Sequence, residues 1–278
     1  MDAQTPPEVL HASRVPPLGD RRYGGVNWLG LRTLLGREVW RFMKVAMQTV
    51  FAPLMSTVLF MMVFALAFGD RPWGLTGAPY VDGLAAGLVM MAVISNAFQN
   101  SSSSIVIAKV QGNAVDFLMP PLSALELAIA FILGAAVRGL VVGAASLIAI
   151  APFADVAPQN IVVAVYFALC ASLIFGAIGL IGGVLADKFD HLAAFTNFVV
   201  TPLTFLSGTF YSVDALPEPF STISHYNPVF FLIDGFRAGF IGHADAPLAL
   251  SASVSGAIAA GLCWGAWALL KSGYRLKA

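Results

Sequence analysis

The chain has 278 residues, of which 58% are hydrophobic and only 11% are charged, and its mean hydropathy is +0.82. Soluble globular domains carry about 25% charged residues, so this composition excludes an ordinary soluble domain. Charge-free runs of more than twenty residues recur along the sequence. Membrane lipid is therefore an expected partner of the chain, and nucleic acid is not.

The first 44 residues divide into two parts. Residues 1–26 contain four prolines and no apolar stretch that resembles a signal peptide, which predicts a disordered cytoplasmic tail. Residues 27–44 predict a basic amphipathic helix that lies in the membrane plane, the alternative being a simple basic anchor before the first span. Its expected apolar face comprises Trp28, Leu31, Leu35 and Phe42.

Six apolar stretches follow, within residues 45–278, and each can supply the roughly 20 residues that cross about 30 Å of hydrocarbon as a helix. They cover about residues 45–68, 83–107, 124–151, 160–185, 192–212 and 248–270. The alternating pattern of an outer-membrane barrel is absent from the sequence. The predicted fold class is therefore all-α: a polytopic membrane protein with six transmembrane helices.

Basic residues flanking these stretches indicate the orientation. Seven arginines and lysines lie before the first span and three after the last, whereas the loops on the opposite side are mainly acidic. Because cytoplasmic loops are enriched in Lys and Arg, both termini are predicted to be cytoplasmic. Only Arg71 and Arg237 break this bias.

Arg138 is the one charged residue in the apolar run from Leu127 to Ala154, which includes most of the third span. A charge at the centre of a span costs about 2.5–3.5 kcal/mol on insertion scales, so we expect a structural anchor with a compensating partner. Helix-end carbonyls are candidates, and so is Asp234. Asp234 and Arg237 are three residues apart, which predicts an ion pair on one helix face, and a surface pair of this kind contributes little.

Two segments between spans are also predicted to be helical. Residues 109–121 predict a short cytoplasmic helix with one apolar stripe, which either the transmembrane bundle or a soluble partner must bury. The stretch 220–233 is short and broken by Asn227-Pro228, which predicts an outer re-entrant segment rather than an ordinary loop.

Glycines recur at four-residue spacing in the spans, a pattern that allows two helix backbones to approach closely. These pairs are Gly83/Gly87, Gly139/Gly143, Gly179/Gly183 and Gly261/Gly265.

The stretch from Thr201 to Ser212, followed by Leu216-Pro217, His225-Tyr226-Asn227-Pro228 and Asp234-Gly235-Phe236-Arg237, resembles the fifth span and re-entrant segment of ABC-2 type transporter permeases. The resemblance, closest to bacterial multidrug-type permeases, covers the chain from about Trp28 to its C-terminus. It implies that residues 109–121 are a coupling helix docked on an ATPase and that 27–44 are the interfacial connecting helix. Relatives usually carry paired glutamates in the coupling segment, whereas this chain has Val115-Asp116.

The resemblance also implies roles for individual residues. Those expected to couple to the ATPase are Gly112, Asn113, Asp116, Phe117, Leu118, Met119, Glu38 and Arg41. Those expected to line the substrate pathway are Asn96, Gln99, Asn100, Thr201, Thr204, Phe205 and Ser207, although these could instead hydrogen-bond only to neighbouring helices. Those expected to be structural are Arg138, Pro202, Gly208, Asn227, Pro228, Asp234 and Arg237.

The expected function is that of the permease subunit of an ATP-driven exporter in the bacterial inner membrane. The sequence has no phosphate-binding Gly-x-x-x-x-Gly-Lys-Ser/Thr motif, so ATP and magnesium are expected on two copies of a separate ATPase, and no cofactor on this chain. The resemblance implies a homodimer that exports an amphipathic, lipid-like or drug-like molecule by alternating access. A polysaccharide or glycolipid exporter is the alternative within the superfamily.

Two other classes of function are weaker. An ion-coupled secondary transporter would favour carboxylates within the spans, and none of the six predicted spans contains one toward its centre. An intramembrane enzyme built on Ser207 and His225 lacks the Gly-x-Ser-x-Gly elbow and a credible base. We therefore predict no catalytic residue and no metal site.

Overall fold

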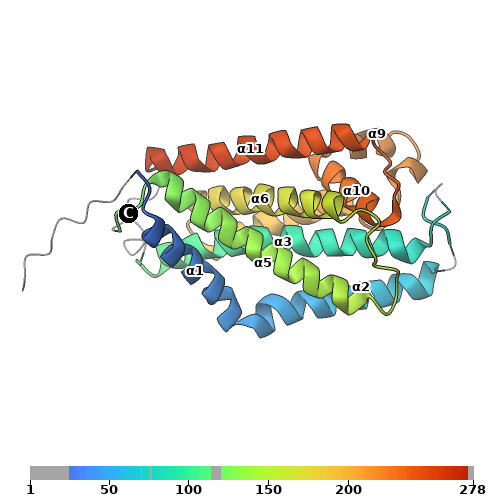
Figure 1. Cartoon of the computed structure of the whole chain (residues 1–278), viewed down its shortest axis with the longest axis horizontal. Helices are drawn as coiled ribbons and strands as arrows, with labels where there is room; N and C mark the ends of the chain where they lie inside the picture. The colour runs from blue at the N-terminus through green and yellow to red at the C-terminus, as the bar shows by residue number, and fades with distance from the viewer. Residues whose placement is uncertain (1–24, 70, 75–76, 114–119, 275–278) are drawn as a thin grey trace, which may run out of the picture.

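The computed structural model describes residues 25–69, 71–74, 77–113 and 120–274, and this part of the chain is built from helices without any strand (Figure 1). The all-α fold class is confirmed. The helices are α1 (Trp28–Lys44), η1 (Met47–Phe51), α2 (Ala52–Phe68), α3 (Tyr80–Val110), α5 (Ala124–Ile150), α6 (Ile161–Leu185), α7 (Phe189–Phe195), η2 (Thr196–Val200), α8 (Thr201–Phe205), η3 (Val213–Ala215), α9 (Phe220–Tyr226), α10 (Pro228–Ile241) and α11 (Leu248–Ser272).

Five of the described helical stretches are long and apolar enough to cross a membrane. Helix α3 is the centre of the bundle, since 78% of the residues in its apolar part are buried. It packs mainly against α6 and α5. The helix that continues from η1 into α2 is only 11% buried, and α11 is 17% buried. Apolar side chains that the subunit itself does not cover thus gather on α2 and α11, where lipid or protein can bury them.

The fifth predicted span, 192–212, differs from the structure. A helical stretch runs from Phe189 through η2 to Phe205, and the chain then turns at Gly208, whose φ of +75° favours glycine. The helix therefore ends seven residues before the predicted boundary. The count of six spans is not established, because this stretch is shorter than the other five.

Both π-helical turns, η1 and η2, end two residues before a proline. Met47–Phe51 precedes Pro53, and Thr196–Val200 precedes Pro202. Proline lacks a backbone N–H and its ring clashes with the carbonyl four residues earlier. A wider turn relieves this clash, so the prolines explain where the two helices change pitch.

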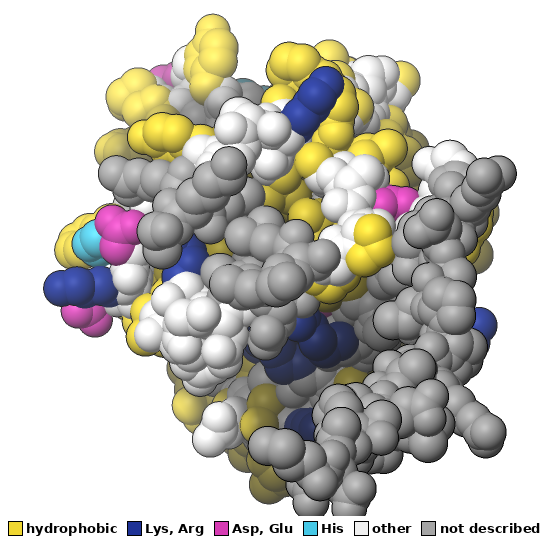
Figure 2. Space-filling model, turned by 90° about the vertical axis from the view of Figure 1, so that its left-hand side faces the viewer, with side chains coloured by type: hydrophobic (Ala, Val, Ile, Leu, Met, Phe, Trp, Pro, Cys, Tyr) yellow, Lys and Arg dark blue, Asp and Glu magenta, His cyan; other side chains and the backbone are white. Residues whose placement is uncertain are grey.

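Helix α1, the C-terminal end of α3, the start of α5 and the C-terminal end of α11 lie at the same end of the bundle (Figure 1). Figure 2 views this end and shows Lys and Arg side chains distributed over it. Helices α9 and α10 and the connection between α2 and α3 lie at the opposite end. This arrangement agrees with the charge bias of the sequence.

The break at Asn227-Pro228 separates α9 from α10. The Asn227 side chain caps α10 by accepting a hydrogen bond from Val229 N (3.0 Å), and Pro228 occupies the first turn, where a missing N–H costs nothing. Helix α10 then packs against α6, α3 and α11. The expectation of a weak surface pair on this helix was wrong, because Asp234 and Arg237 are both at most 1% exposed.

Helix α1 buries part of the predicted apolar face, since Phe42 is buried and Leu31 and Leu35 are half-buried. Its buried residues are Leu34, Glu38 and Phe42, whereas Trp28, which we placed on the apolar face, is 72% exposed. Helix α1 packs against α5, while the buried Glu38 carboxylate has its polar partners on α3 and on α1 itself. Burial of a carboxylate is favourable only when such partners exist.

Two of the four glycine pairs, those on α5 and α6, occur where helices touch within the subunit. A Cβ on Gly179 would collide with the carbonyl oxygen of Phe98, and a Cβ on Gly139 would lie 3.0 Å from that of Val93. Nothing lies within 4 Å of such an atom at Gly261 or Gly265. Close approach of two helices therefore accounts for the pairs on α5 and α6 but not for the pair on α11, and the pair on α3 instead makes room for the Trp73 side chain and the Thr209 backbone.

Candidate functional site

One face of α3 carries a stripe of polar residues, most of which are buried, although Gln99 is exposed. Five of them are spaced three or four residues apart and so share one side of the helix: Asn96, Gln99, Asn100, Ser103 and Ser104. Partners come from α1 and α5, which supply Glu38, Arg41 and Arg138. We call Glu38, Arg41, Asn96, Gln99, Asn100 and Arg138 the polar seam.

Arg138 extends from the middle of α5 to α3 and is 5% exposed. Its Nη2 donates to Asn96 Oδ1 at 3.0 Å and to Gln99 Oε1 at 3.5 Å. The Asn96 side chain is oriented for this contact, since its own Nδ2 donates to the backbone oxygen of Ala92. Our proposed partners, Asp234 and helix-end carbonyls, were wrong: side-chain amides from α3 solvate the guanidinium instead.

Glu38 and Arg41 join α1 to the same stripe of α3. The Glu38 carboxylate is fully buried and accepts hydrogen bonds from Arg41 Nη2 (3.1 Å) and Ser104 Oγ (2.9 Å). Arg41 Nη2 also donates to the backbone oxygen of Asn100 (2.7 Å). These two residues, expected to couple to an ATPase, therefore fasten α1 to the transmembrane bundle rather than project into solvent.

A second cluster organises the connection between α3 and α5. Glu126 accepts hydrogen bonds from Asn27 N (2.5 Å) and Ser123 N (2.6 Å), and Asn27 Nδ2 donates to the oxygen of Pro121 (3.2 Å). The start of α1 is thus bound to the start of α5. Sequence reasoning missed Glu126, although Ser123-x-x-Glu126 is a capping-box pattern that could have been recognised.

The other end of this connection is held by Lys109. Its Nζ donates to the carbonyl oxygens of Val184 (2.9 Å) and Ala186 (2.7 Å) at the C-terminal end of α6. Gly112 follows with φ +71°, and Asn113 N bonds to Ala108 O at 2.8 Å. Four predicted coupling residues lie outside the described residues: Asp116, Phe117, Leu118 and Met119.

At the opposite end, a buried ion pair ties α10 to its surroundings. Arg237 Nη1 lies 3.8 Å from Asp234 Oδ1, its Nη2 donates to the oxygen of Gly208, and its guanidinium stacks 4.4 Å from the centre of the Trp73 ring. Asp234 also accepts hydrogen bonds from the backbone N–H groups of Asp245 (2.9 Å) and Ala246 (3.1 Å). The cluster closes the end of the bundle where α10 meets the turn after α8.

The remaining predicted pathway residues are bonded mainly within this region. Thr204 Oγ1 donates to Val200 O, and Ser207 Oγ accepts from Asn227 Nδ2 at 2.8 Å. Phe205 is 39% exposed and contacts the edge of the Phe210 ring. Thr201 is half-buried at the start of α8. Ser207, Gly208 and Asn227 are therefore brought together near Arg237, well away in sequence from the polar seam.

Close by, the Asp214 carboxyl lies on η3, outside the long helices, beside His225. Burial raises the pKa of Asp214 above its ordinary value, the Asp245 carboxylate adds to the rise, and His225 and His243 oppose it. The His225 Nε2 atom is 3.9 Å from Asp214 Oδ1. Among the described residues, no group of three or more His, Cys, Asp or Glu side chains could hold a metal ion.

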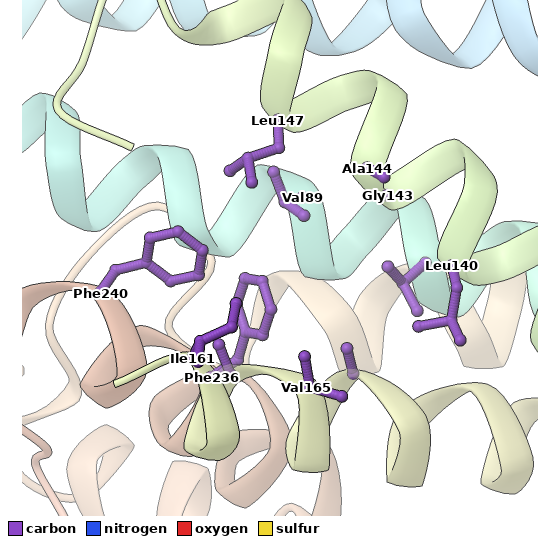
Figure 3. A pocket seen from close by; sticks show the side chains of 12 residues that line it. Val89, Leu140, Gly143, Ala144, Leu147, Ile161, Val165, Phe236 and Phe240 are labelled. Carbon is purple, nitrogen blue, oxygen red and sulfur yellow. The ribbon is translucent and has the colours of Figure 1, made fainter. Parts of the chain in front are cut away.

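The bundle also contains an apolar pocket of about 150 Å³ between α3, α5, α6 and α10. Figure 3 shows carbon side chains directed into it, including those of Val89, Leu147, Phe236 and Phe240. No charged or amide side chain lines this pocket. It can receive an apolar chain but cannot orient a polar headgroup, which separates it chemically from the polar seam.

The model of the ABC-2 type transporter family matches residues 30–241. The chain is 32% identical over 250 residues to "Inner membrane transport permease YadH" of Escherichia coli K12, covering 90% of this chain and 98% of the relative. It is also 24% identical over 240 residues to "Nodulation protein J" of Sinorhizobium fredii, covering 84% of this chain and 90% of that protein. The residues matched by the family model include the polar seam and Arg237.

Proposed function

Because this chain belongs to the ABC-2 type transporter family, we propose that it is the permease subunit of an ATP-driven exporter in a bacterial inner membrane. It would work as a homodimer with two copies of a separate ATPase. Permeases of this family generally pair with an ATPase subunit, and the relative from E. coli is named an inner membrane transport permease.

The observation that most supports this proposal is how firmly the connection after α3 is held at both ends. Lys109 bonds it to the end of α6, and Glu126 bonds it to the start of α1. A movement imposed on residues 109–121 would therefore be transmitted to α1, α3, α5 and α6 together. This is the mechanical property required of a coupling segment.

In the proposed cycle, ATP binding draws the two ATPases together and shifts the connection after α3. Glu38 and Arg41 transfer this shift from α1 to the residues of the polar seam that lie on α3. The cluster around Arg237 holds the opposite end closed until α10 and the turn at Gly208 move apart. Substrate then leaves on the side opposite the ATPase.

The test is to co-express the chain with an ABC ATPase encoded beside it, purify the pair and measure ATP hydrolysis in lipid vesicles. We expect a stable complex whose hydrolysis rises with added amphiphile. The double substitution Phe117→Ser with Leu118→Ser should abolish the association. The control Tyr274→Ser removes an exposed apolar side chain near the end of α11 and should leave association intact. A failure of the wild-type chain to bind the ATPase would refute the proposal.

A further inference from the structure

Arg138 carries a positive charge that the described part of the protein does not neutralise. Five ion pairs occur among the described residues, and Arg138 is in none of them. Its partners Asn96 and Gln99 are neutral amides. Since arginine stays protonated in proteins, a full charge is held near the middle of α5 by dipoles alone.

The same region contains two buried donors that have no acceptor: Arg138 Nε and Asn100 Nδ2. A Cβ on Gly134 would lie 3.6 Å from Asn100 Nδ2, and Gly134 precedes Arg138 by four residues, or about 6 Å along the helix. Both unused donors therefore lie where α3 faces α5. A buried donor without an acceptor costs about 1–3 kcal/mol, so this arrangement favours an acceptor that is bound from outside.

Three arginine side chains, those of Arg37, Arg41 and Arg138, belong to this region and differ in exposure. The Arg37 side chain is 46% exposed and that of Arg41 is 28% exposed, whereas Arg138 is buried. Against these three cations the region offers one carboxylate, that of Glu38. Gln99, one of the partners of Arg138, is exposed, so the seam reaches the surface of the subunit.

We infer that the polar seam binds the anionic headgroup, a phosphate or a carboxylate, of an amphiphile whose apolar part stays along the exposed side chains of α2. Arginine presents its N–H groups in a fork that matches the oxygens of such a group. Helix α2 packs on both α3 and α5 and exposes Met55 and Leu59. This inference rests on the proposed exporter function and assigns its substrate class.

The test measures binding to the full chain in a neutral maltoside detergent, without ATPase or ATP. Dodecyl phosphate is expected to bind saturably, and dodecyltrimethylammonium and inorganic phosphate are not. Arg138→Gln should weaken binding of dodecyl phosphate at least tenfold. Lys271→Gln, which removes an exposed cation on α11, should not change it.

Asn100→Asp provides a variant that does not depend on losing the arginine. It places a carboxylate where the unused donors lie, so we expect dodecyl phosphate binding to fall at least tenfold while the melting temperature stays the same or rises. Wild-type affinity in both Arg138→Gln and Asn100→Asp would overturn the inference, and so would equal binding of the cationic amphiphile.

An experiment on the ATPase complex in phosphatidylcholine vesicles distinguishes a transported substrate from a resident membrane lipid. Stimulation of ATP hydrolysis by dodecyl phosphate, lost in Asn100→Asp, is the expected result. Saturable binding with no effect on hydrolysis would identify the occupant as a resident membrane lipid and overturn its assignment as substrate. Binding without any association of the ATPase would refute the proposed function and leave the anion site standing.

Discussion

Asp234→Asn is the most informative test of the buried cluster around α10. The substitution keeps the shape of the side chain but removes the charge that faces Arg237 at 3.8 Å. Arg237 is 1% exposed, so its charge would remain buried without a carboxylate. Breaking a buried pair in this way costs about 3–5 kcal/mol.

The structure places the expected loss near the lower end of that range. An asparagine still offers one oxygen to one of the two backbone N–H groups that Asp234 now serves through separate oxygens, and Arg237 retains the oxygen of Gly208 and the Trp73 ring. We therefore expect the free energy of unfolding to fall by about 3 kcal/mol. The effect would be measured by titration of mixed micelles with dodecyl sulfate, followed by tryptophan fluorescence.

Two comparisons decide whether this reasoning holds. Asp190→Asn changes an exposed carboxylate on α7 and should alter the free energy of unfolding by less than about 0.5 kcal/mol. Asp234→Asn combined with Arg237→Gln should cost less than the sum of the two single changes, because no unpaired charge remains. Additive losses, or a loss no larger than that of Asp190→Asn, would refute the assignment of a stabilising pair.

Three further substitutions test contacts elsewhere in the bundle. Glu126→Gln should lower the free energy of unfolding by about 1–3 kcal/mol and uncouple ATP hydrolysis from transport, because α1 loses its charged tie to α5. Lys109→Gln should speed hydrogen exchange at the end of α6, measured by mass spectrometry, because two carbonyls lose their cationic donor. Gly179→Ala should lower the free energy of unfolding by about 1–3 kcal/mol through collision with Phe98, whereas Gly265→Ala should not lower it, as dodecyl sulfate titration would show.

Each of these has an outcome that contradicts it. Unchanged coupling in Glu126→Gln would mean that α1 is not bound to α5 through this carboxylate. Unchanged exchange near the end of α6 would remove Lys109 as its cap. Equal effects of alanine at the two glycine positions would show that the close approach of α3 and α6 does not depend on the missing Cβ.

Local patterns were sufficient to predict several parts of the fold. Charge-free length predicts apolar helices because lipid leaves the backbone no other partner, and five helices that meet this requirement are present. Asn227-Pro228 predicts a break between two helical segments, because Pro lacks a backbone N–H and disfavours the helical conformation at the residue before it. The polar stripe on α3 can also be predicted from the sequence, since it depends only on the helical spacing of the polar residues.

What that stripe contacts depends on tertiary packing. Asn96 and Arg138 are 42 residues apart, and hydropathy does not determine the rotation of α5 against α3. The sequence marked Arg138 as a residue that requires a partner, but only the packed helices decide that amides supply it rather than Asp234. Asp234 is instead enclosed with Arg237, because α10 packs into the bundle instead of lying on its surface.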